Sequence, residues 1–129
     1  MFTTHEALKA TQDILRSGIT LEQFHAQHGI RGKTDDQLLI LDYDQIEVKW
    51  AEPFGYVCRG LILDAKTFAV ISMALPKFFN AGEHYAAALD WATATAMEKL
   101  DGSMVQRFWN PYTNAFEYST RFQLPRDMK

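Results

Sequence analysis

The sequence has little that would support redox chemistry, a cysteine-rich metal site or membrane insertion. Cys58 is the only cysteine in 129 residues, which excludes an internal disulfide and a multi-cysteine zinc site and suits a reducing compartment. No apolar run reaches the roughly 18 residues that a membrane span needs, and the first nine residues lack the charged-then-apolar order of a signal peptide. We therefore expect a cytoplasmic protein with no membrane partner.

An excess of positive charge is also lacking. The formal net charge of −3 argues against a protein that coats nucleic acid through bulk positive charge, so any nucleic-acid contact must be local. Neither a Walker-type phosphate loop nor the glycine fingerprint of dinucleotide-binding domains is present. What the chain does have is 47% hydrophobic and 13% aromatic residues, enough for one globular domain over residues 1–129.

The first thirty residues have the pattern of two helices. Two pairs have the spacing of a capping box, and each precedes apolar residues at helical intervals: Thr3 with Glu6, and Thr20 with Gln23. Gly18 and Gly29 follow as C-terminal stops. We predict a longer helix up to Gly18 and a shorter one up to Gly29, both as scaffold.

After residue 37 the pattern changes to short apolar or alternating runs separated by turn residues, which is typical of strands. The predicted strands are 38–41, 56–63, 68–75, 92–98, 103–109 and 115–121. Turn-forming residues at 64–67 and 110–114 predict hairpins, so neighbouring strands should pair antiparallel. The predicted fold class is α+β, with two N-terminal helices followed by an antiparallel sheet.

The most informative motif is a lysine two residues before Asp-Gly. Lys99, Asp101 and Gly102 lie between two strand-like runs. Asp-Gly is a hairpin signal, a solvated lysine beside it is ordinary, and chance alone gives such a string in about a few per cent of chains this long. The functional interpretation is a nucleophilic lysine whose pKa is lowered by cations, for which Arg59 and Lys77 are candidates that would also bind a triphosphate.

Four blocks together resemble one family. Lys99 to Ser103 matches the Lys-x-Asp-Gly signature of the covalent nucleotidyltransferases, which are ATP-dependent DNA ligases, RNA ligases and capping enzymes. The other three blocks resemble segments that precede this lysine in phage-type RNA ligases of the tRNA-repair kind: Tyr43-Asp44-Gln45-Ile46, Cys58-Arg59-Gly60-Leu61-Ile62-Leu63-Asp64 and Pro76-Lys77-Phe78-Phe79-Asn80. The resemblance covers about residues 38–121, and its Lys-Phe-Phe-Asn block opposes a DNA ligase or capping enzyme.

This resemblance implies roles for individual residues. Lys99 would form lysyl-AMP, with Asp101 and Gly102 beside the nucleotide, and Arg59 and Lys77 would contact the ATP phosphates. For two further residues, two roles remain open. Phe79 either packs in the nucleotide pocket or belongs to the core. Arg121 either contacts the nucleotide or is a solvated strand residue, because Phe122 stands where the family has glycine.

The implied reaction is ATP-dependent RNA joining in a viral or bacterial host cytoplasm. Lys99 takes AMP from ATP, AMP passes to a 5′-phosphate RNA end, and a 3′-hydroxyl displaces it to seal the strand. The implied cofactors are ATP and Mg²⁺, with no metal ligand assigned among the residues, and the implied partner is RNA with tRNA-like broken ends.

The resemblance also leads us to expect an incomplete adenylation domain. Family members carry a glutamate-bearing strand and late lysines after the position of Arg121, and these are not in this sequence. Either a complementary C-terminal polypeptide supplies them, or the chain is a catalytically silent remnant that binds nucleic acid or protein. We further expect an unpaired sheet edge and exposed apolar surface, which would favour dimerisation or aggregation.

Two other groups of residues have alternative interpretations. His25 and His28 could share a helix face and bind a metal, but without a third ligand they are interpreted as ordinary histidines. Trp91, Trp109 and Tyr112 could stack on bases near Arg107, although core or hairpin packing is the simpler interpretation.

Overall fold

The computed structural model describes residues 2–128 and begins with two capped helices. They are α1 (Thr4–Arg16) and α2 (Leu21–His28). Both predicted capping boxes form: the Thr3 hydroxyl accepts from the Glu6 N–H at 3.1 Å, and the Thr20 hydroxyl accepts from the Gln23 N–H at 3.0 Å. Gly29 ends α2 in the left-handed conformation, with φ of 69°. The two predicted helices are therefore confirmed.

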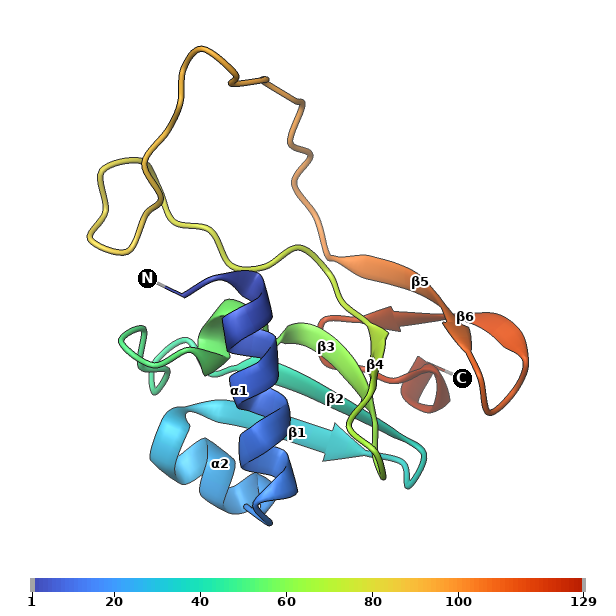
Figure 1. Cartoon of the computed structure of the whole chain (residues 1–129). Helices are drawn as coiled ribbons and strands as arrows, with labels where there is room; N and C mark the ends of the chain where they lie inside the picture. Colours follow the sequence, from blue (N-terminus) through green and yellow to red (C-terminus); the bar gives the residue numbers. More distant parts are fainter. Residues whose placement is uncertain (1, 129) are drawn as a thin grey trace.

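The helices cover one face of a four-stranded antiparallel sheet (Figure 1). Its strands follow in the order β1 (Ile30–Thr34), β2 (Leu38–Tyr43), β3 (Arg59–Asp64) and β4 (Val70–Ser72). All six residues of β2 are buried. Leu39, Leu41 and Leu61 belong to the core cluster on the helix side, and Leu38, Ile40 and Ile62 to a second cluster on the other side. The central strands are thus covered on both faces.

A hairpin covers the second face. It consists of β5 (Val105–Asn110) and β6 (Ala115–Thr120), which form a separate two-stranded sheet. Phe108 and Leu124 pack against Leu38, Ile40 and Ile62. The Gln106 side-chain amide donates to the Gly60 carbonyl at 2.6 Å, and the Tyr112 hydroxyl donates to Asp64 at 2.5 Å. The α+β class is confirmed, with two antiparallel sheets in place of the single sheet that we predicted.

Two strand predictions need correction, and one strand was missed. Residues 92–98 form no strand, because no neighbouring chain pairs with them and every one is exposed. The strand predicted from residue 56 starts at Arg59, since residues Phe54–Tyr56 form a 3-10 turn. The strand β1 was not predicted. Residues 73–104 contain neither helix nor strand, and much of this segment stands away from the sheets (Figure 1, yellow to orange).

Within residues 2–128, none of the helices combines the length and the apolar character needed to cross a membrane.

Candidate functional site

A buried carboxylate joins two arginines at the end of β2. Asp42 is 2% exposed, and its two carboxylate oxygens accept from Arg31 Nη2 at 2.9 Å and from Arg121 Nε at 2.7 Å. A buried carboxylate is costly unless it is paired, and the two guanidinium groups supply that pairing. Burial lowers the pKa of Arg121, but the hydrogen bond to Asp42 and its charge outweigh that effect and raise the pKa.

An aromatic cluster surrounds Lys77. The Lys77 Nζ lies 5.2 Å from the ring centre of Phe79, 5.7 Å from that of Trp50 and 5.9 Å from that of Tyr43, which are cation–π distances. The Lys77 backbone N–H donates to the Tyr56 carbonyl at 2.8 Å. The Arg121 guanidinium lies 4.4 Å from the Tyr43 ring. Tyr43 therefore joins Lys77 to Arg121, and neither cation is simply a solvated surface charge.

Phe79 belongs to the packing around this cluster. Its ring meets Trp50 edge-on at 5.1 Å and Tyr56 at 6.0 Å, and it packs against the helix-side core. Because it also lies beside the Lys77 ammonium, the core and pocket interpretations describe the same position.

Arg59 begins β3 opposite Asp42. Its guanidinium lies 5.9 Å from the ring of Phe78, which is 61% exposed. The Arg59 Nε is buried and has no hydrogen-bond partner among the described residues. A buried donor without an acceptor is unusual and costly, and an anionic ligand would satisfy it.

Gly60 lets three segments approach each other closely. Its φ of +74° is strained for residues other than glycine, and a Cβ there would lie 2.8 Å from Met104 Cε and 3.3 Å from Arg121 Cα. The chain just after Gly102 and the chain just after β6 therefore both lie against the start of β3. This contact brings Arg59 and Arg121 into one region.

The predicted nucleophile lies outside that region. Lys99, Asp101 and Gly102 are all exposed and lie in the segment that precedes β5. A Cβ built on Gly102 would have no neighbouring atom within 4 Å. Met104, five residues after Lys99, contacts Gly60, and a five-residue extended chain reaches about 17 Å. The structure thus brings Arg59, Lys77, Phe79 and Arg121 into one region. Lys99, Asp101 and Gly102 lie outside it, in a segment that is connected to it through Met104.

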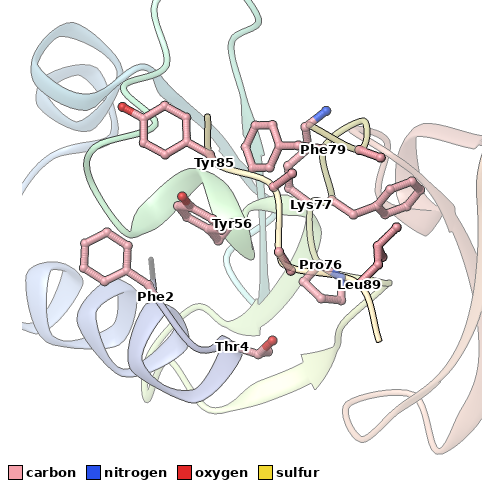
Figure 2. A pocket seen from close by; sticks show the side chains of 12 residues that line it. Phe2, Thr4, Tyr56, Pro76, Lys77, Phe79, Tyr85 and Leu89 are labelled. Atoms are coloured by element: carbon pink, nitrogen blue, oxygen red, sulfur yellow. The ribbon is translucent and has the colours of Figure 1, made fainter. Parts of the chain in front are cut away.

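Two cavities flank the cation cluster. The first, of about 340 Å³, lies between the start of α1 and the chain after Pro76, and Lys77 is the one charged residue among its described lining (Figure 2). Its wall is mainly apolar and aromatic, including Phe2, Tyr56 and Tyr85. The second, of about 420 Å³, is lined by Arg31, Asp42 and Arg121 among others. Neither cavity is lined by Lys99.

The two histidines of α2 each pair with a carboxylate. His25 lies 2.8 Å from Asp44, and His28 lies 2.6 Å from Glu52. The hydrogen bond with His25 is the main cause that lowers the pKa of Asp44. Among the residues that the structure describes, no group of three or more potential metal ligands was found. Each histidine of α2 therefore has a carboxylate partner within the fold.

Sequence reasoning missed the residues that assemble this region, namely Arg31, Asp42 and Trp50. The sequence did indicate that Asp42 needs a partner, because this acidic residue directly follows the apolar residues 38–41. It did not indicate that Arg121 is a partner, since Arg121 is 79 residues away in the sequence.

Comparison with known proteins gives one informative relative. No family model matches the chain, and no solved structure matches it. A protein of Autographa californica nuclear polyhedrosis virus, described as "Putative bifunctional polynucleotide kinase/RNA ligase", is 30% identical over 102 residues. The similarity supports an RNA ligase-like relationship for this chain. The match covers 71% of this chain, and the chain spans 14% of the length of that relative.

Proposed function

We propose that this chain is the lysine-bearing part of an ATP-dependent RNA ligase of the phage tRNA-repair type, within the covalent nucleotidyltransferases. The observation that carries the proposal is the similarity to the viral kinase/ligase over 71% of the chain, and the Lys-x-Asp-Gly motif at Lys99 supports it from the sequence. The substrates are ATP and the 5′-phosphate end of a broken RNA. The product of the first step is a lysyl-AMP on Lys99.

The charges near β3 suit a triphosphate. Lys77 and Arg121 both contact the Tyr43 ring, and the Nε of Arg59 is a buried donor without an acceptor among the described residues. Arginine and lysine are the residues that bind and neutralise phosphate oxygens. The apolar cavity beside Lys77 has the size of a small ligand site, so we assign it to the nucleoside. Mg²⁺ would be held mainly by the phosphates and would stabilise charge on the leaving pyrophosphate.

In the first step the Lys99 amine, after losing a proton to solvent, attacks the α-phosphorus of ATP. A nitrogen–phosphorus bond forms, the bond to the β-phosphate oxygen breaks, and pyrophosphate leaves with the electron pair. A 5′-phosphate oxygen of RNA then takes the adenylyl group and releases the lysine, and a 3′-hydroxyl displaces AMP. Lys99 must first approach the cations, which the tether at Met104 permits.

The test is covalent labelling. We would incubate the chain with ATP labelled at the α-phosphate and Mg²⁺, alone and with a second polypeptide carrying the glutamate- and lysine-bearing segments expected from the resemblance, and resolve it under denaturing conditions. Label is expected on wild type and on Lys66→Ala, whose lysine is exposed in the β3–β4 turn. It should be absent from Lys99→Ala and Lys99→Arg, and weaker with Lys77→Ala. Folded wild type without label in either arm would overturn the proposal.

A second candidate is a binding domain without catalytic activity. One observation favours it, namely that Lys99, Asp101 and Gly102 lie apart from Arg59, Lys77 and Arg121. In that case wild type and Lys99→Ala would both remain unlabelled and would still bind RNA equally well.

A further inference from the structure

The outer face of the β5–β6 hairpin is aromatic where a solvated sheet face is usually polar. Cross-strand neighbours share a face, and three such pairs point away from the core: Val105 with Thr120, Arg107 with Tyr118, and Trp109 with Phe116. The alternate residues Phe108, Asn110 and Ser119 are buried on the inner face. We call the six outward residues the hairpin platform.

The hairpin platform is open to solvent. Val105, Trp109, Phe116 and Tyr118 are between 49% and 58% exposed. In an antiparallel sheet with one solvated face, apolar residues normally point inward and polar residues outward. Three exposed aromatic rings in adjacent positions depart from this pattern, and such exposed apolar patches mark binding sites.

The side chains of the hairpin platform are already arranged for stacking. The Arg107 guanidinium lies 3.8 Å from the Phe116 ring centre, and Trp109 meets Phe116 edge-on with the ring centres 5.2 Å apart. Tyr118 is the cross-strand neighbour of Arg107. Aromatic rings and a guanidinium plane on a sheet surface are the groups on which unpaired bases stack.

Charge and size favour a nucleic-acid strand over a protein partner. None of the six platform residues is acidic, and Arg107 supplies a positive charge. Glu117 points to the inner face, where it accepts from Asn110 at 2.9 Å. Six residues are also far fewer than the roughly 20–30 residues that each side of a stable protein interface provides.

We infer that the hairpin platform binds two or three unpaired bases of single-stranded RNA. This inference rests on the proposed function only for the choice of RNA as the ligand. The site differs from the cation cluster, because the platform faces away from the four-stranded sheet and its residues line neither of the two cavities. It would hold the RNA next to a broken end while Lys99 and the cations act on that end.

The experiment measures binding of fluorescein-labelled oligo(rA) and oligo(rU), each 12 nucleotides long, by anisotropy, with a 12-base-pair RNA duplex beside them. Trp109→Ala and Phe116→Ala should each weaken single-strand binding by about tenfold. Trp91→Ala is the matched control, because Trp91 is 78% exposed but lies in the segment before β5. It should change the affinity less than twofold. Circular dichroism would establish that each variant is folded.

Several results would overturn the inference. They are equal affinity for duplex and single strand, no binding by folded wild type, or unchanged binding by both platform variants. Concentration-dependent dimerisation in sedimentation that Trp109→Ala abolishes would assign the hairpin platform to a second copy of the chain instead. Lys66→Ala should bind RNA like wild type. The anisotropy measurement needs no adenylation, so a failure of labelling at Lys99 and a failure of the platform are distinguishable.

Discussion

At the scale of single residues, Asp42 explains why the candidate site assembles. An isolated buried carboxylate would be unfavourable, and only the approach of Arg31 and Arg121 makes its position acceptable. The resemblance singled out Arg121 and left its role open between nucleotide contact and solvated strand residue. The structure removes the second alternative, because Arg121 is partly buried and hydrogen-bonded. Its contact with nucleotide stays a prediction.

Cys58 gives a second prediction at this scale. It is fully buried, with Sγ 4.0 Å from the Thr11 hydroxyl oxygen, and burial raises its pKa to about 12. The thiolate is the reactive form, so the folded protein at pH 8 should not react with a disulfide reagent such as DTNB within minutes. The same protein in urea should react fully. A raised folded pKa means that stability is full below the ordinary thiol pKa and declines only as pH rises toward 12.

The matched control is Ser17→Cys in a Cys58→Ala background, because Ser17 is exposed at the end of α1. It should react at once under native conditions. Rapid native reaction of the wild-type protein would contradict the buried placement of Cys58.

At the scale of elements, both helices were predictable, whereas β1 was missed and the strand predicted at residues 92–98 was wrong. Capping boxes and glycine stops are local signals, and they set the bounds of α1 and α2. β1 lacks an apolar alternation, and it exists because all five of its residues pair with β2. The alternating residues 92–98 resemble a strand but have no partner, and a strand is stable only within a sheet.

The cap of α1 can be tested directly. Thr3→Ala removes the hydroxyl that accepts from the Glu6 N–H and should lower the free energy of unfolding by about 1 kcal/mol. Thr3→Ser keeps a hydroxyl acceptor, so the free energy of unfolding should change by only about a few tenths of a kcal/mol. Urea unfolding followed by circular dichroism gives both values. Equal stabilities of Thr3→Ala and Thr3→Ser would show that the hydroxyl contributes nothing.

At the scale of the whole molecule, the parts of the candidate site come from segments far apart in the sequence. The resemblance could name Arg59, Lys77 and Arg121, but it could not show what brings them together: β-strand pairing, the close contact at Gly60 and the ion pair of Arg121 with Asp42. Lys99 lies in a segment without strand or helix, so no comparable contact fixes it against the cations. The chemistry-bearing residues were therefore easier to predict than their arrangement.

Three carboxylates link distant parts of the fold, and each has a lowered pKa. The main cause is a hydrogen bond from His25 for Asp44, from Tyr112 for Asp64, and from Lys33 for Asp127. When the folded pKa is depressed, the stabilisation is present above the ordinary carboxyl pKa of about 3.9 and is lost as pH falls through the lower folded value. The protein should therefore lose stability in acid below about pH 4.

The link between Tyr112 and Asp64 allows this acid loss to be assigned, because it joins the β5–β6 loop to the end of β3. Tyr112→Phe removes the donor, so the pKa of Asp64 should return toward its ordinary value and the variant should be less stable than wild type at pH 7. Its deficit should shrink as pH falls, since protonated Asp64 no longer stabilises the wild type through its charge. Thermal melts of both proteins at pH 7 and at about pH 3 measure the two deficits.

Tyr118→Phe, on the outer face of the same hairpin, is the control and should show no such change. A Tyr112→Phe deficit that is constant with pH would mean that the hydrogen bond holds the hairpin without depending on the ionisation of Asp64.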